Sequence, residues 1–133
     1  MLKRNKHFVL MLLALTFPFA IAGCSSDGGS ASYEQISGAE AKALMDSESG
    51  YIIIDARTQS EFDEGHIPGA ILIPEYEIAE RAESELSDKN QLILVYCRSG
   101  RRSKIAAEEL VKLGYTNVKE FGGIIDWEYE IVK

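Results

Sequence analysis

Short apolar runs alternate with amphipathic stretches along this chain. Residues 51–54 and 91–96 are mainly apolar and of strand length, which predicts two strands buried on both faces of a sheet. Residues 103–113 have helical periodicity instead, with one apolar stripe made of Ile105, Ala106, Leu110 and Leu113. Strands that alternate with helices indicate an α/β domain with a parallel sheet and helices on both faces.

Capping boxes mark two further helix starts. Ser37 with Glu40, and Thr58 with Glu61, have the spacing at which each side chain bonds the other residue's backbone N–H. A helix should follow each box, the second ending near Gly65. Weaker patterns complete the prediction: strands at 70–73 and 118–121, a helix with Ile78, Ala82 and Leu86 on one face, and a short terminal helix holding Trp127.

The first 23 residues have the pattern of a secretory signal. A basic start precedes an apolar run from Phe8 to Ala22, and small residues end it. The alternative is a permanent transmembrane helix. That alternative is disfavoured because spanning a bilayer takes about 20 apolar residues, whereas this run is shorter and Pro18 interrupts it.

The end of this segment, Ile-Ala-Gly-Cys at residues 21–24, resembles the lipobox of bacterial lipoproteins. The resemblance implies cleavage before Cys24, lipidation of Cys24, and a lipoprotein anchored in a cell-envelope membrane, facing the periplasm or the exterior. The alternative is an ordinary cleaved signal. Residues 24–32 then form the lipidated cysteine and a flexible linker rich in Gly and Ser, and residues 33–133 form one domain.

Charge excludes one class of partner. Without residues 1–23 the chain keeps 11 basic and 21 acidic residues, a net charge of −10. Nucleic-acid binding depends on neutralising phosphates, so no nucleic-acid partner is expected. The sequence shows no metal-ligand cluster, and no metal site is predicted.

Cys97 is the candidate nucleophile. It directly follows the strand at 91–96 and precedes a helix, so it lies where parallel sheets place their ligand sites. Free N–H groups and the positive helix end should lower the thiol pKa from about 8.5. Gly100 permits a tight turn, and Arg98, Arg101 and Arg102 form a local anion site in an acidic chain. The alternative is an inert buried cysteine in a solvated basic loop.

These residues resemble the single-domain rhodanese family. Residues 97–103, Cys-Arg-Ser-Gly-Arg-Arg-Ser, look like its active-site loop, and residues 54–70 contain its Asp-x-Arg turn and its Gly-His-Ile-Pro-Gly-Ala segment. Residues 113–118 and 122–127 also fit, so the resemblance covers roughly 33 to 130. It implies a rhodanese-like fold with about five parallel strands.

The resemblance also implies a mechanism without a cofactor. The Cys97 thiolate would take sulfur from a small anionic, thiosulfate-like donor and pass it from a persulfide to cyanide or a thiol. Backbone N–H groups of the loop that runs through Ser99 and Gly100 to Ser103 would stabilise the terminal sulfur. The arginines would attract the donor. A monomer is expected, since so short a domain needs no partner to close its core.

Three other residues invite catalytic roles that the resemblance makes structural. Asp55 and Arg57 mostly hold loops together in the family and would support the site, although Asp55 could reach the Cys97 loop and Arg57 could join the anion site. His66 could form a dyad with Cys97, but in the family it belongs to a turn.

Other functions remain open. Phosphatases of the same fold carry Cys-x5-Arg, a spacing that neither Arg101 nor Arg102 provides. A persulfide carrier, served by a protein donor, would need the same cysteine and loop. A non-catalytic binding or sensor module is a further alternative. Some rhodanese-like domains of that kind lose the cysteine, and the retention of Cys97 argues against it.

Overall fold

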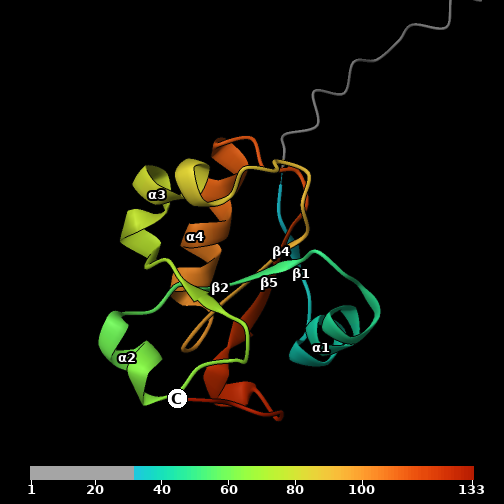
Figure 1. Cartoon of the computed structure of the whole chain (residues 1–133), viewed down its shortest axis with the longest axis vertical. Helices are drawn as coiled ribbons and strands as arrows, with labels where there is room; N and C mark the ends of the chain where they lie inside the picture. Colours follow the sequence, from blue (N-terminus) through green and yellow to red (C-terminus); the bar gives the residue numbers. More distant parts are fainter. Residues whose placement is uncertain (1–31) are drawn as a thin grey trace, which may run out of the picture.

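The computed structural model describes residues 32–133, which form a five-stranded parallel sheet with strand order β1-β5-β4-β2-β3. The proposed signal segment, Cys24 and all but the last residue of the proposed linker lie outside the described residues. The elements, shown in Figure 1, are β1 (Glu34–Gln35), α1 (Gly38–Ser47), β2 (Ile52–Asp55), α2 (Gln59–Glu64), β3 (Ile71–Leu72), η1 (Glu75–Glu77), α3 (Ile78–Glu85), β4 (Ile93–Cys97), α4 (Arg101–Lys112), β5 (Val118–Gly123) and η2 (Ile124–Asp126).

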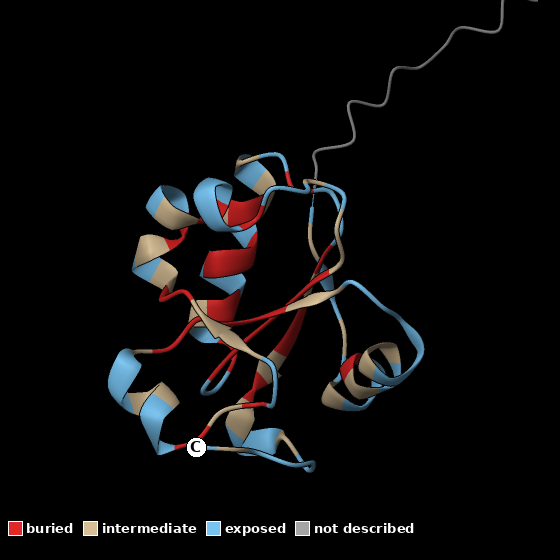
Figure 2. Cartoon of the chain, in the orientation of Figure 1, coloured by how far each residue is buried: buried red, intermediate tan, exposed pale blue. Residues whose placement is uncertain are grey.

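Helices cover both faces of the sheet, as the alternating pattern predicts. In Figure 1, α3 and α4 lie on one side of the strands and α1 lies on the other. Side chains of β4 alternate between the two sides: Val95 belongs to the apolar cluster beneath α3 and α4, while Leu94 and Tyr96 belong to the cluster beneath α1. Figure 2 shows buried residues concentrated in the strands and on the inner side of α4. The predicted α/β class is therefore confirmed.

Both predicted capping boxes are present. The Ser37 hydroxyl accepts from Glu40 N at 3.1 Å, and Glu40 Oε2 accepts from Ser37 N at 2.7 Å. Thr58 and Glu61 form the same reciprocal pair before α2. These helix starts are local in sequence, which is why four-residue spacing is enough to predict them.

Three elements differ from the sequence prediction. Strand β1 has two exposed polar residues that pair with β5 through the backbone, so it carries no apolar pattern to detect. Helix α4 begins at Arg101, two residues before the predicted start. The predicted terminal helix is the single 3-10 turn η2, and Trp127 follows it, with its ring centroid 5.6 Å from that of Phe121.

Within residues 32–133, none of the helices combines the length and the apolar character that crossing a membrane requires.

The end of β5 packs against the connection that follows β4. A Cβ built at Gly123 would overlap the carbonyl oxygen of Arg98 and stand 2.6 Å from the Cα of Ser99. Cys97 and Gly123 are also partners in the β4–β5 register. The absence of a side chain at Gly123 therefore allows the two backbones to meet.

Gly123→Ala is expected to lower the free energy of unfolding by about 3 kcal/mol, since backbone rather than a flexible side chain must move to admit the methyl group. Gly38→Ala is the matched control, because its Cβ would make only an ordinary 3.5 Å contact with the Trp127 ring. Urea unfolding of the full chain measures both. Equal stability of the two variants would contradict the close packing.

Candidate active site

Cys97 is the last residue of β4, and its side chain lies inside the turn that leads into α4. The residue is 1% exposed. Gly100 N donates a hydrogen bond to Cys97 Sγ at 3.0 Å, and Ser103 Oγ lies 3.3 Å from the same sulfur. Gly100 has φ +104°, a left-handed conformation that lets the turn close back over the sulfur. The turn therefore directs hydrogen-bond donors at one buried atom.

This environment favours the thiolate of Cys97. Burial raises the pKa of the thiol, because a charge in a poorly solvated position is unfavourable. Hydrogen bonds to the sulfur from the Ser103 hydroxyl, and from the backbone N–H groups of Ser103, Gly100 and Ser99, outweigh burial and hold the pKa below its ordinary value. The N-terminus of α4 adds its positive dipole end at the same place.

The three arginines of the loop have different environments. Arg102 forms a two-pronged ion pair with Glu61 of α2, at 2.7 and 2.8 Å, so its charge is largely neutralised. Arg98 and Arg101 are exposed and form no ion pair with any residue from 32 to 133. Two of the three arginines are thus available to attract an anion.

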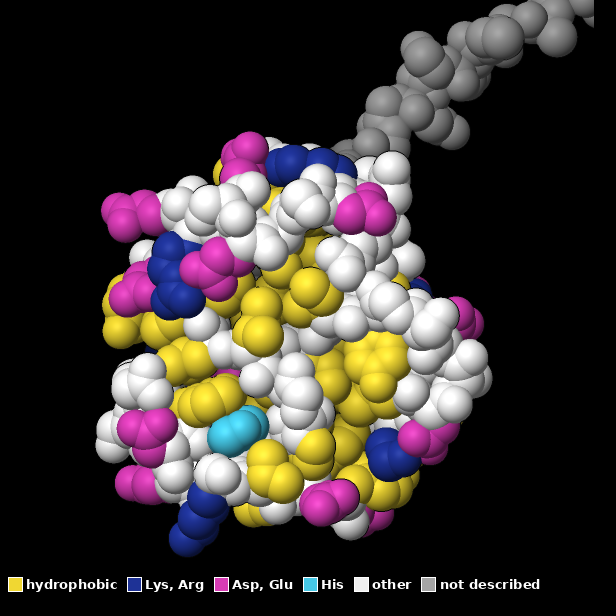
Figure 3. All heavy atoms as spheres, in the orientation of Figure 1, with side chains coloured by type: hydrophobic (Ala, Val, Ile, Leu, Met, Phe, Trp, Pro, Cys, Tyr) yellow, Lys and Arg dark blue, Asp and Glu magenta, His cyan; other side chains and the backbone are white. Residues whose placement is uncertain are grey.

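Acidic side chains dominate the protein as a whole. The net charge is −7, and Figure 3 shows Asp and Glu side chains all around the margin of one face, with Lys or Arg side chains beside some of them. Arg98 and Arg101 adjoin Cys97 and are unpaired among residues 32–133, so in an acidic protein they would attract a small anion to this part of the surface.

Asp55 and Arg57 form a buried network beside the loop. The Arg57 guanidinium bonds both carboxylate oxygens of Asp55, at 2.6 to 3.0 Å, and donates to Gly65 O at 2.7 Å. The Tyr96 hydroxyl donates to Asp55 at 2.7 Å and accepts from Ile67 N at 3.1 Å. Arg57 is 5% exposed and already has its partners. The pair ties the segment after β2 to β4 and makes no hydrogen bond to the Cys97 thiol.

His66 belongs to a turn. Its ring stacks on Phe62 with centroids 3.7 Å apart, and its Nδ1 lies 2.9 Å from Phe62 O. Its backbone pairs with Val132 near the C-terminus. The ring partners of His66 are therefore on α2, and the structure gives no geometry for a dyad with Cys97.

Glu120 is the residue of this site that sequence reasoning missed. It is 3% exposed on β5, and its Oε1 accepts from Ser103 Oγ at 2.6 Å and from Gly122 N at 2.8 Å. Alternation along β5 places Glu120 on the same face as Val118, which is buried in the core beneath α4. A charged residue at a core-facing strand position was the available signal.

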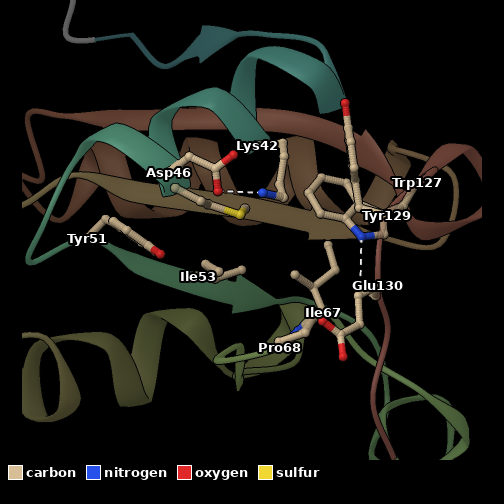
Figure 4. A pocket seen from close by; sticks show the side chains of 10 residues that line it. Lys42, Asp46, Tyr51, Ile53, Ile67, Pro68, Trp127, Tyr129 and Glu130 are labelled. Atoms are coloured by element: carbon tan, nitrogen blue, oxygen red, sulfur yellow. Dashed lines mark hydrogen bonds and ion pairs between the residues drawn. The ribbon is translucent and has the colours of Figure 1, made fainter.

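A separate groove lies on the α1 side of the sheet. It has a volume of about 190 Å³ and contains no residue of the loop 97–103. Its lining comes from α1, β2 and the residue before it, the segment between α2 and β3, and the C-terminal segment, as Figure 4 shows. The lining residues are Lys42, Met45, Asp46, Tyr51, Ile53, Ile67, Pro68, Trp127, Tyr129 and Glu130. The described part of the chain also holds no cluster of His, Cys, Asp and Glu that could bind a metal.

The fold and the loop define a member of the rhodanese-like class. The family model for the rhodanese-like domain matches residues 37–130, so the chain belongs to this family.

Known relatives include sulfur-handling proteins. The thiosulfate sulfurtransferase PspE of Escherichia coli (strain K12) is 42% identical over 73 residues, covering 55% of this chain and 70% of the relative. The putative sulfur carrier protein YrkF of Bacillus subtilis (strain 168) is 35% identical over 106 residues, covering 79% of this chain; this chain spans only 56% of that relative. A solved structure described as rhodanese with anions from E. coli is 40% identical with a TM-score of 0.59, covering 62% of this chain and 98% of that one.

The Glu61–Arg102 pair predicts acid sensitivity. The Arg102 hydrogen bond holds the pKa of Glu61 at about 2, against an ordinary 4.5. A lowered folded-state pKa stabilises the fold above pH 4.5, and this stabilisation is lost between about pH 4.5 and 2. Glu61→Gln should therefore be less stable than wild type by about 1 kcal/mol at neutral pH, and the difference should disappear near pH 2.

Denaturant unfolding of the full chain at several pH values measures this difference. Glu64→Gln, an exposed position at the end of the same helix, is the control. A stability difference that stays constant from pH 7 to pH 2 would rule out an ionic contribution from Glu61.

Proposed function

We propose that this protein is a sulfurtransferase that carries sulfur on Cys97. The observation that carries the proposal is the convergence of Gly100 N–H and the Ser103 hydroxyl on a buried sulfur at the start of a helix. The thiolate attacks the outer sulfur of a thiosulfate-like donor. A new S–S bond forms at Cys97, the S–S bond of the donor breaks, and sulfite leaves with the electron pair.

The same turn suits the product of that step. The persulfide carries its negative charge on the terminal sulfur, beside the backbone N–H groups of the turn and the positive end of α4. Arg98 and Arg101 are exposed and unpaired among the described residues, so they attract the anionic donor. Cyanide or a thiol then attacks the terminal sulfur, and the Cys97 thiolate is released.

Phosphatase chemistry fits this site less well. The loop has no Cys-x5-Arg spacing, and its last arginine, Arg102, is engaged by Glu61 instead of facing a substrate. A carrier that receives sulfur from a protein donor is the second candidate, because one relative is described as a putative sulfur carrier protein.

The central prediction is a persulfide on Cys97. Thiosulfate should add one sulfur atom (about 32 Da) to the peptide that contains Cys97, and cyanide should remove it as thiocyanate. Peptide mass spectrometry of the full chain, after alkylation of the persulfide, measures the gain, and Cys97→Ser is the control that should show none. A mass gain only with a persulfidated protein donor would establish the carrier, and no gain with any sulfane donor would refute sulfur transfer.

We also propose that the chain is exported and anchored by lipid on Cys24, on the strength of the lipobox resemblance at residues 21–24. Cells fed a tagged fatty acid should label the wild-type chain and Cys97→Ser, but not Cys24→Ser, and the labelled chain should sediment with membranes. An unlabelled wild-type chain would refute the anchor. In a bacterium with two membranes, a Ser directly after the lipidated cysteine, as at Ser25, resembles the pattern of lipoproteins that are sent to the outer membrane. Retention of the protein in the inner membrane would contradict that destination.

A further inference from the structure

Among residues 32–133, Glu120 is a buried carboxylate without a cationic partner. Its Oε1 receives only two hydrogen bonds, from the Ser103 hydroxyl and from Gly122 N. No Lys, Arg or His of residues 32–133 forms an ion pair with it. A buried carboxylate normally has a fixed positive partner, as Asp55 has in Arg57. The position of Glu120 therefore calls for a functional explanation.

Ser103 links this carboxylate to the nucleophile. A hydroxyl has one proton to donate, and the shortest contact of Ser103 Oγ is the one to Glu120, at 2.6 Å. Hydrogen bonds to a carboxylate are the stronger kind, so the serine proton points to Glu120. The lone pairs of Ser103 Oγ then face the Cys97 thiol, which donates to it across 3.3 Å. Cys97 therefore donates to Ser103, and Ser103 donates to the Glu120 carboxylate.

Charge decides where the proton of Cys97 goes. If it left for solvent, two negative charges would remain in a buried site, separated by a single hydroxyl group. If it moved to Glu120, one negative charge would remain, now on sulfur. The Ser103 proton would then point to the thiolate, which is the arrangement that lowers the pKa of Cys97.

The neighbouring charged groups do not remove this constraint. On α4, Arg102 is paired with Glu61 of α2. On β2, which pairs with the far side of β4, Asp55 is paired with Arg57. Lys119 of β5 points to the opposite face of its strand and pairs with Glu34 of β1. Arg98 and Arg101 are exposed, so solvent screens their charges.

We propose that Glu120 accepts the proton of Cys97 through Ser103. The S–H proton passes to Ser103 Oγ while the proton of that hydroxyl passes to Glu120 Oε1. The products are a Cys97 thiolate, an intact serine hydroxyl and a neutral carboxylic acid, and no proton or charge enters or leaves the site. The transfer is reversible, so the single proton is shared between Cys97 and Glu120. Glu120 is thus a positioning residue. It determines whether the nucleophile carries its proton, and it does not touch the substrate.

The relay would help a site that receives an anion. With the proton on Glu120, an approaching dianionic donor meets the charge of one thiolate and not that of a thiolate and a carboxylate together. The proposal concerns the free protein and can be tested without any sulfur donor. Its outcome is therefore independent of whether the protein proves to be a sulfurtransferase or a carrier.

The test is the ionisation of Cys97 between pH 4 and pH 9, followed by thiolate absorbance near 240 nm. Cys97→Ser provides the baseline, so the full chain can be used and the signal of Cys24 cancels. A shared proton predicts two steps in wild type: a partial thiolate signal that is constant over a range of pH, and then a rise as the second proton leaves.

Glu120→Gln keeps the shape of the side chain but cannot take the proton. It should show a single step, with the thiolate signal falling about tenfold per pH unit below the midpoint and no plateau. Glu108→Gln, an exposed position on α4, is the matched control and should keep the two steps. A merely structural Glu120 would not produce a plateau.

Two results would overturn the proposal. One is a single-step titration of wild-type Cys97, which needs no variant and so holds even if Glu120→Gln fails to fold. The other is a Glu120→Gln variant that keeps the plateau of the wild type.

Discussion

The close approach of the end of β5 to the turn after β4 is the contact on which this site depends. Gly123 lets the backbone of Arg98 and Ser99 rest directly on β5. This contact brings Glu120 beneath Ser103, and it keeps the donors of the turn directed at Cys97. A side chain at position 123 would separate the strand from the loop, so the electrostatics of the nucleophile depend on a backbone contact.

Two buried carboxylates, Asp55 and Glu120, differ in whether a positive charge lies beside them. Asp55 is held by the Arg57 guanidinium and the Tyr96 hydroxyl, so its charge is compensated and its role is to connect β2, β4 and the segment up to Ile67. Within the described part of the chain, Glu120 receives hydrogen bonds from a hydroxyl and one N–H but has no cationic partner. The charge of Asp55 is compensated by Arg57, whereas the lack of such compensation at Glu120 is the basis of the proposed proton transfer.

The three arginines of the loop differ in whether they have an ion-pair partner. Arg102 joins α4 to α2 through Glu61, which is itself part of a capping box, so one carboxylate both starts α2 and holds the start of α4 in place. Arg98 and Arg101 remain exposed. The unpaired positive charge of the loop is therefore smaller than its count of arginines indicates.

Sequence by itself determined the elements and residues that depend on local patterns. The capping boxes, the apolar strands β2 and β4, and Cys97 at the junction of strand and helix are all defined within a few consecutive residues, because hydrogen bonding at helix ends and burial of strands are local effects. The resemblance of residues 97–103 and 54–70 to the rhodaneses added the strand count and the sulfur chemistry.

Only the tertiary structure decided which side chains meet. Strand β1 has no apolar pattern and exists through backbone pairing with β5, more than eighty residues away. The partner of Arg102 lies 41 positions earlier in the chain, and Glu120 reaches Ser103 across 17 positions. No local pattern encodes such distances, because the order of strands in the sheet sets them. Cys97 could thus be proposed as the nucleophile from sequence, whereas Glu120, the proposed acceptor for its proton, could be recognised only once the sheet was assembled.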